Sequence, residues 1–418
     1  MKNTITDIYA RQILDSRGNP TIETVVSTEK GICAKASVPS GASVGKFEAL
    51  ELRDSNKDYY RGKSVLKAIQ NVNNCINKLL KNRNVLDTTK LDLLMIEEDN
   101  TDNKSNLGAN AILSVSLAVA KCAAKTLGIP LFQYIGGINA TRIPVPFINI
   151  LNGGVHADND LDFQEFMIVP FGFENFSEAI RAANDVFFEL KKNLKSSGYS
   201  TSVGDEGGFA PELETNEQAI RMVMKAIEGA GYDYNQIKIA IDAASSVFYE
   251  NGYYSLISES RTLTSDEMLD YINSLITKYP IISIEDAMSE DDRLGWQKLT
   301  KTDGEKIMLV GDDLMVTNPK RIKECIKENI SNTVLIKPNQ IGTVTETINA
   351  VKIAKEAGYK AIISHRSGET AETFIADLAV GLNAGYIKTG SLSRGERTEK
   401  YNRLLEIESM LDNSTYSF

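Results

Sequence analysis

The stretch Ile281-Ile-Ser-Ile-Glu-Asp286 follows Tyr279-Pro280, and it combines a short apolar run with two carboxylates at its end. A similar run that ends on one carboxylate occurs earlier, at Ile237-Lys-Ile-Ala-Ile-Asp242, and one that ends on two occurs later, at Ile307-Met-Leu-Val-Gly-Asp-Asp313. Short β-branched runs of this kind, separated by helical patterns, are typical of buried parallel strands in βα units. We therefore expect this half of the chain to be a series of βα units.

Further strands extend the series in both directions. Capping signals at Thr264-Ser-Asp-Glu267 and Asn318-Pro319 mark helix starts between the strands. Eight strands with mostly helical crossovers predict a (β/α)8 barrel. The alternative is a doubly wound sheet, which is weaker because no GxGxxG opens a helix after a first strand. The remaining strand-like runs are Val145–Leu151, Phe163–Val169, Thr333–Lys337, Lys360–Ser364 and Tyr386–Lys388.

The beginning of the chain has a different pattern. Strand-like runs at Ile5–Leu14, Thr21–Ser27 and Ile32–Val38 come first, and helical patterns follow from Ser64 and over 109–124. Strands followed by helices favour an α+β module. We expect an α+β domain over residues 1–138 and a barrel domain over 139–418.

The composition argues against several classes of protein, including nucleic-acid-binding and membrane-spanning proteins. A formal net charge of −10 argues against a nucleic-acid-binding protein. The four cysteines have no metal-ligand spacing and the first residues form no apolar run, so a cytoplasmic protein is expected. The most apolar stretch, Ala109–Ala124, is interrupted by Ser114, Ser116 and Lys121, so we expect a buried helix and no membrane span.

The strongest functional signal is the charge at the strand ends. In a barrel these residues meet at one mouth, where barrel active sites lie. Three carboxylates on separate strands repel one another and need a cation, and an all-oxygen ligand set favours Mg²⁺ or Mn²⁺. The last six strands end on Asp242, Glu285, Asp312, Lys337, Ser364-His365 and Lys388.

Acid–base groups accompany these carboxylates. A nearby divalent cation favours the neutral form of a lysine, so Lys337 is a candidate base. Glu206, in the loop Gly204-Asp-Glu-Gly-Gly208, is a candidate acid. The lysines and Arg366 predict a cationic pocket for a phosphate or carboxylate. The chain has only two histidines, His156 and His365, and both lie in polar, glycine-containing segments.

Other motifs fail on spacing. Gly41-Ala-Ser-Val-Gly-Lys46 is one residue short of a phosphate-binding P-loop, and Phe47 replaces its Ser or Thr. The run from Asp158 to Asp162 begins like an EF-hand, but Phe163 replaces the required glycine and Val169 the final glutamate. The sequence contains no GxSxG nucleophile elbow.

Six segments of the chain are especially specific: Ala10–Thr21, Pro39–Ser43, Gln164–Met167, Gly204–Gly208, Lys337–Thr343 and Ser364–Thr370. Taken together, these motifs resemble the enolase family along nearly the whole chain. The resemblance implies an α+β N-terminal domain on a barrel that begins in ββαα order. It also implies Mg²⁺-dependent, reversible dehydration of 2-phosphoglycerate to phosphoenolpyruvate.

The resemblance also implies a role for each matching residue. Lys337 is the expected base and Glu206 the expected acid. Enolase-superfamily sites use a Lys or His base with one or two Mg²⁺, so this mechanism comes from the resemblance and not from the spacing. Expected metal ligands are Asp242, Glu285 and Asp312, with Ser43 at a second Mg²⁺ on a loop, and expected substrate contacts are His156, Gln164, Glu165, His365, Arg366, Ser367 and Lys388.

Three positions depart from the usual family pattern: Val44, Val247 and Ala287. A related barrel enzyme acting on a sugar acid is disfavoured, because Lys238-Ile-Ala lacks the second lysine of a Lys-x-Lys base. A further alternative is a non-enzymatic role in addition to catalysis, either plasminogen-type binding from a cell-surface or secreted pool or membership of an RNA-processing complex. The resemblance also implies a homo-oligomer, either a dimer or an octamer.

Overall fold

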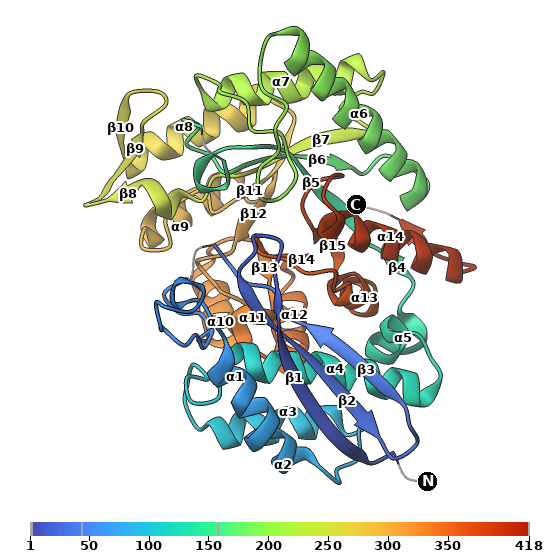
Figure 1. The fold of residues 1–418 in the computed structure, drawn as a ribbon. Helices are drawn as coiled ribbons and strands as arrows, with labels where there is room; N and C mark the ends of the chain where they lie inside the picture. Colours follow the sequence, from blue (N-terminus) through green and yellow to red (C-terminus); the bar gives the residue numbers. More distant parts are fainter. Residues whose placement is uncertain (1–2, 43–44, 158, 417–418) are drawn as a thin grey trace.

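The computed structural model describes residues 3–42, 45–157 and 159–416, and Figure 1 shows a sheet-and-helix unit beside a barrel. The N-terminal unit is built on three antiparallel strands in the order β1 (Ile5–Leu14), β2 (Pro20–Thr28) and β3 (Cys33–Ser37). Its helical segments are α1 (Leu66–Gln70), a π-helical turn (Asn71–Ile76), α2 (Asn77–Leu80), α3 (Thr88–Asp99), α4 (Ala109–Leu127) and α5 (Leu131–Gly136).

Helix α4 is the alanine-rich helix expected from the sequence, and it packs against β2 and β3. Its length and composition alone would allow it to cross a membrane, but 78% of its apolar window is buried inside the protein. The serines that interrupt the apolar run are satisfied by other elements. Ser114 Oγ lies 2.6 Å from Thr24 Oγ1, and Ser116 Oγ accepts the N–H of Val344 at 2.9 Å. The helix is therefore a core element of this fold.

The barrel is closed, in the order β11-β12-β13-β14-β15-β5-β6-β7. Neighbouring strands are parallel except that β6 is antiparallel to both β5 and β7. The closed sheet confirms the barrel and excludes the doubly wound alternative. The strands are β5 (Val145–Asn152), β6 (Glu165–Pro170), β7 (Ile237–Asp242), β11 (Ile281–Glu285), β12 (Met308–Gly311), β13 (Thr333–Ile336), β14 (Lys360–Ser364) and β15 (Gly385–Lys388).

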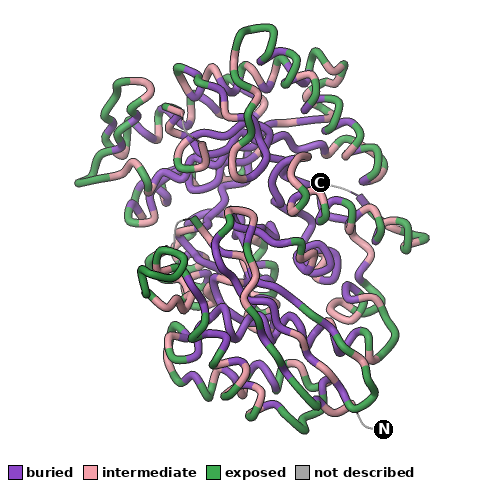
Figure 2. The backbone as a smooth tube through the Cα atoms, viewed as in Figure 1, coloured by how far each residue is buried: buried purple, intermediate pink, exposed green. Residues whose placement is uncertain are grey.

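The chain runs β5, β6, α6, α7, β7, which confirms the ββαα start. Thr264 forms a complete capping box with Glu267, and Asn318 caps its helix by accepting the N–H of Lys320. Figure 2 shows that burial is concentrated along the barrel strands and along the elements that join the two units. The helices are α6 (Phe176–Ser196), α7 (Asn216–Gly229), α8 (Ser265–Lys278), α9 (Arg293–Asp303), α10 (Pro319–Glu328), α11 (Pro338–Ile341), α12 (Val344–Glu356), α13 (Phe374–Gly381) and α14 (Gly395–Met410).

Two small sheets were not expected from the sequence. One consists of β8 (Tyr249–Glu250), β9 (Tyr253–Leu256) and β10 (Arg261–Thr264), and the other pairs β4 (Arg142–Ile143) with β16 (Thr415–Tyr416). Asn251 and Gly252 connect β8 to β9 with positive φ values of 53° and 88°. Asn-Gly in such a two-residue loop is a strong hairpin signal, so the β8–β9 hairpin could have been predicted from the sequence.

The two units meet beside the barrel mouth. Ser40 and Gly368 exchange backbone hydrogen bonds of 2.8 and 2.9 Å. A Cβ atom on Gly368 would lie 2.6 Å from Asp15 Oδ2 and 2.8 Å from Ser40 O, so only glycine allows this approach. The contact places the segment that leads into residues 43–44 next to Arg366 and Ser367.

Candidate active site

Strand register brings the charged strand ends to one mouth. Glu285 pairs with Asp242, and Lys388 pairs with Ser364. Because β6 is antiparallel to its neighbours, its first residue, Glu165, lies at this same end and pairs with Asp242. A cavity of about 80 Å³ lies here, and among the described residues six carboxyl groups and three lysine or arginine side chains line it. The cavity thus combines buried groups of both signs with an excess of acids.

Lys388 is surrounded by carboxylates. Its Nζ donates to Asp242 Oδ2 at 2.9 Å and to Glu285 Oε2 at 2.8 Å, and it lies 3.2 Å from Glu165 Oε1. Burial lowers the pKa of Lys388, but the three carboxylates outweigh burial and raise that pKa well above its usual value. Lys388 is therefore an ammonium ion that partly compensates its acidic neighbours.

Lys337 plays the same part on the other side of the cavity. Its Nζ is paired with Asp312 Oδ2, and Gln340 Nε2 donates to Asp312 Oδ1 at 2.9 Å. Burial lowers the pKa of Lys337, but the carboxylate of Asp312 outweighs burial, so the pKa lies above its usual value. Lys337 and Asp312 form a buried ion pair.

Asp286 supports the turn after β11. Its two carboxylate oxygens accept the backbone N–H groups of Asp312 and Asp313 at 2.9 and 3.0 Å. Burial, followed by the negative charges of Asp313 and Asp312, raises the pKa of Asp286 well above its usual value. The negative charge here exceeds what the neighbouring cations compensate.

The donor set fits a hard divalent cation. The expected ligands Asp242, Glu285 and Asp312 are all buried and all present oxygen atoms at the mouth. Burial and the carboxylate of Asp242 raise the pKa of Glu285 well above its usual value. The ionised form of Glu285 is therefore unfavourable here unless a positive charge lies beside it. The ligand atoms of Asp286, Asp312 and Asp313 lie within 4.8 Å of one another, whereas Asp242 and Glu285 are joined through Lys388. Ser43, expected at a second metal, lies outside the described residues.

The other wall of the cavity carries the candidate acid. Asn149 Nδ2 donates to Glu206 Oε2 at 3.1 Å, and His365 Nε2 lies 3.4 Å from the same oxygen. His156 Nδ1 lies 3.5 Å from Glu165 Oε1 and 3.8 Å from Glu206 Oε1. Both histidines and both glutamates therefore belong to one buried network.

The loop after Glu206 depends on a glycine. Gly207 has a φ of +88°, and a Cβ atom there would lie 2.5 Å from Ser393 O. A side chain would therefore meet both backbone strain and a clash. The Asp-Glu-Gly-Gly run is thus explained by the way this loop places Glu206.

The two glutamates of this network have pKa values shifted in opposite directions. Burial, followed by the charge of Glu206, raises the pKa of Glu165 to about 7. Burial alone would raise the pKa of Glu206, but His365, His156 and Arg397 hold it well below its usual value. Two coupled carboxyl groups share a proton that belongs to the pair. Of the two, Glu165 is the group that takes up a proton first as the pH falls.

The candidate phosphate ligands lie where the two units meet. Arg366 Nη1 donates to Glu48 Oε2 at 2.9 Å and Nη2 to Glu48 Oε1 at 3.2 Å, and Nη1 also donates to Asn339 Oδ1. Ser367 and Gln164 line the cavity. All expected substrate contacts therefore lie at this mouth.

The chain matches two family models that together span nearly all of it. Residues 5–135 match the enolase N-terminal domain, and residues 140–417 match the enolase C-terminal TIM barrel domain. The chain belongs to the enolase family. Membership implies a hydro-lyase of the enolase superfamily.

The sequence did not indicate every residue that supports this enolase site. Glu48 follows the Pro39–Ser43 motif closely, and that proximity was a usable signal. Asp286 and Gln340 lie inside stretches that the sequence analysis singled out, Ile281–Asp286 and Lys337–Thr343, so their position was a signal as well. Asn149 and Arg397 carry no local pattern, because an interior amide or arginine looks like any polar residue in a sequence. The supporting residues are Glu48, Asn149, Asp286, Gln340 and Arg397.

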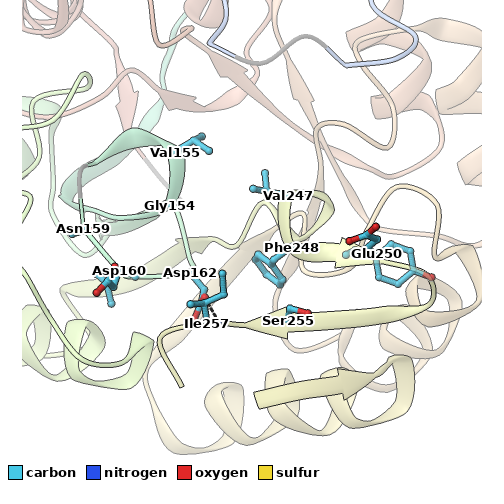
Figure 3. A pocket seen from close by; sticks show the side chains of 12 residues that line it. Gly154, Val155, Asn159, Asp160, Asp162, Val247, Phe248, Glu250, Ser255 and Ile257 are labelled. Carbon is cyan, nitrogen blue, oxygen red and sulfur yellow. Dashed lines mark hydrogen bonds between the residues drawn. The ribbon is translucent and has the colours of Figure 1, made fainter. Parts of the chain in front are cut away.

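A second cavity, of about 600 Å³, lies beside the loop that carries His156 (Figure 3). Gly154, Val155 and residues 159–162 form one wall, and the β8–β9 region with Val247 and Phe248 forms the other. Val155 and Val247, both about half exposed, line it from the two walls. Val247, one of the three departures from the family pattern, lines both this cavity and the active-site cavity. Of the others, Ala287 is buried and Val44 lies outside the described residues.

Proposed function

We propose that this enolase-family chain is the glycolytic and gluconeogenic phosphopyruvate hydratase, which interconverts 2-phosphoglycerate and phosphoenolpyruvate. The observation that carries the proposal is the placement of Lys337 beside Asp312 on one wall of the buried cavity and of Glu165 and Glu206 on the other. An elimination that removes a carbon-bound proton and expels a hydroxyl needs a base and an acid on separate sides of the substrate.

We propose Mg²⁺ as the cofactor, two per active site. Asp242, Glu285 and Asp312 would hold the first ion, and Ser43 would contribute to the second. When bound, the ions supply positive charge at the substrate carboxylate, where proton removal builds up a second negative charge. An ion at the three carboxylates would also replace the charge that Lys388 and Lys337 supply to them.

The protein's own groups account for proton movement. Lys337 Nζ, once it has lost its proton, takes the proton from the carbon next to the substrate carboxylate. The Glu165–Glu206 pair holds a proton opposite and delivers it to the departing hydroxyl. Glu206 is the expected donor, and Glu165, whose pKa burial raises to about 7, is the member of the pair that can carry a proton near neutral pH. A positioned acid or base typically contributes about 10²- to 10⁴-fold to the rate.

Charged groups position the substrate. Arg366, with Ser367, would bind the phosphate, because a guanidinium presents paired donors that match its oxygens. Lys388 would bind the substrate carboxylate after giving up its present carboxylate partners. Gln164, His156 and His365 complete the lining of the cavity.

We also propose that the protein is located in the cytoplasm and forms a homo-oligomer, either a dimer or an octamer. Neither the family matches nor any described residue supports the plasminogen-type or RNA-processing alternative, so we do not propose it.

The test is phosphoenolpyruvate formation from 2-phosphoglycerate, followed by ultraviolet absorbance with Mg²⁺ and with a chelator. Lys337→Ala should lower turnover about 10²- to 10⁴-fold, since it removes the base. The matched control is Lys352→Ala, because Lys352 is exposed on α12 and pairs only loosely with Glu356 at 3.8 Å. An inactive wild type in Mg²⁺, or near-normal turnover by the Lys337 variant, would refute the proposal.

A further inference from the structure

Arg397, in the first turn of α14, is completely buried behind the acid wall of the cavity. Its Nη1 lies 2.6 Å from His365 Nδ1 and donates to Arg366 O at 2.7 Å. Its Nη2 donates to Ser367 O at 2.6 Å and to Asp205 O at 3.1 Å. One side chain therefore ties together the loop that carries Glu206 and the segment 365–367.

This contact determines the tautomer of His365. A guanidinium in a protein stays protonated and can only donate hydrogen bonds. His365 Nδ1 must therefore accept the bond from Arg397, which leaves the ring proton on Nε2. Nε2 lies 3.4 Å from Glu206 Oε2. The proton thus points at the carboxylate expected to act as the acid.

We propose that Arg397 is a positioning residue, which holds His365 as the neutral Nε2–H tautomer so that the imidazole donates to Glu206. The catalytic part of this inference rests on the proposed function, whereas the tautomer does not. The opposite tautomer would place two donors against each other at Nδ1 and leave Glu206 Oε2 facing a ring nitrogen without a proton.

The surroundings of His365 favour the neutral ring. The charged groups facing it are Glu206, Arg397 and Glu369, and burial dominates their combined effect by lowering the pKa of His365 to about 4. Protonation would require Nδ1 to carry a hydrogen against the guanidinium. The ring should therefore keep one tautomer throughout the range in which the protein works.

The tautomer of His365 can be measured directly by NMR. The chain has only two histidines, so His156→Gln leaves one imidazole to assign in ¹⁵N-histidine-labelled protein. Long-range ¹H–¹⁵N correlation spectra should show His365 with a bare Nδ1 and a protonated Nε2 from about pH 5.5 to 8. A proton on Nδ1, or conversion to imidazolium in this range, would overturn the inference.

Variants test the link to catalysis. Arg397→Gln offers an amide that can accept as well as donate, so it should populate both tautomers and lower kcat about 10- to 100-fold, as is typical when an orienting partner is lost. Arg397→Lys keeps a donor-only cation and should restore the single tautomer and most of kcat. The matched control is Arg403→Gln, since Arg403 lies on the same helix but pairs with Asp377 and should leave the tautomer unchanged.

The two proposals fail in distinguishable ways. An active wild type with the proton on Nδ1 would overturn the inference and leave the proposed function intact. A wild type that does not turn over 2-phosphoglycerate but has the Nε2–H tautomer would overturn the proposed function and the catalytic part of the inference. If Arg397→Gln lowers kcat while the tautomer stays single, the positioning role is refuted.

Discussion

Replacing His365 with Gln should change how stability depends on pH. The folded ring has a pKa lowered by burial to about 4, against an ordinary value of 6.5. Below pH 6.5 the unfolded chain therefore binds a proton that the folded chain refuses. The stability that the neutral ring contributes is complete above pH 6.5 and is lost as the pH falls toward 4. Linkage gives a loss of about 2 kcal/mol between pH 7.5 and 5, and about 3 kcal/mol by pH 4.

The second histidine provides the opposite control. Burial lowers the pKa of His156, but Glu206 and Glu165 outweigh burial and raise it above 6.5. Its contribution to stability is therefore complete below pH 6.5 and is lost as the pH rises through the folded pKa. Comparing His156→Gln with wild type should give a pH slope of opposite sign.

The assay is urea unfolding of wild type and both variants in chelator, at fixed ionic strength, from pH 5 to 8. Subtracting each variant from wild type removes the contribution of the carboxylates that lie far from the replaced ring. The stability advantage of wild type over the His365 variant should shrink by about 2 kcal/mol toward pH 5. A difference that is flat within about 0.5 kcal/mol, or that grows toward low pH, would refute the assignment of a neutral buried ring.

Three other variants probe the site. Glu48→Gln removes the carboxylate that accepts from both Nη atoms of the buried Arg366 and should lower the free energy of unfolding by about 3–5 kcal/mol in urea titrations; a loss under 1 kcal/mol would contradict this. Mg²⁺ at 100 times its Kd should stabilise wild type by about 2.7 kcal/mol, and Asp242→Asn should abolish most of that gain in thermal unfolding. Asp286→Asn removes one of the two acceptor oxygens and leaves the N–H of Asp312 or Asp313 without its bond, so the free energy of unfolding should fall by about 1–3 kcal/mol. The measurement is urea unfolding in chelator, and an unchanged midpoint would argue against the supporting role.

The barrel and its mouth could be predicted because two independent signals coincide in the sequence. Apolar runs followed by helix caps identify βα units, and a parallel barrel brings the carboxyl end of each strand to one face. Glu165 is different, because it begins its strand. Only the antiparallel direction of β6 brings it to the same mouth, and here the family resemblance supplied what periodicity did not.

Arg397 shows what a single sequence conceals. The stretch Gly395-Glu-Arg-Thr-Glu-Lys400 has the composition of a solvated helix start, yet Arg397 and Lys400 are both buried. The Nη atoms of Arg397 donate to carbonyl oxygens on two loops, and Lys400 Nζ donates to Thr370 O and pairs with Glu369. Those partners come from distant parts of the chain, so the inward orientation depends on tertiary contacts that no local pattern encodes.

Adjacent carboxylates in the sequence have different roles in the structure. Glu285 and Asp286 are equally plausible metal ligands from their residue types alone. The structure distinguishes them by their contacts, because Glu285 is the last residue of β11 and accepts from Lys388, whereas Asp286 follows the strand with a φ of 41° and contacts backbone N–H groups. Both oxygens of Asp286 already accept backbone N–H groups, and giving either up would leave a buried donor unpaired. Asp286 is therefore better placed to hold Asp312 in position than to coordinate a cation itself.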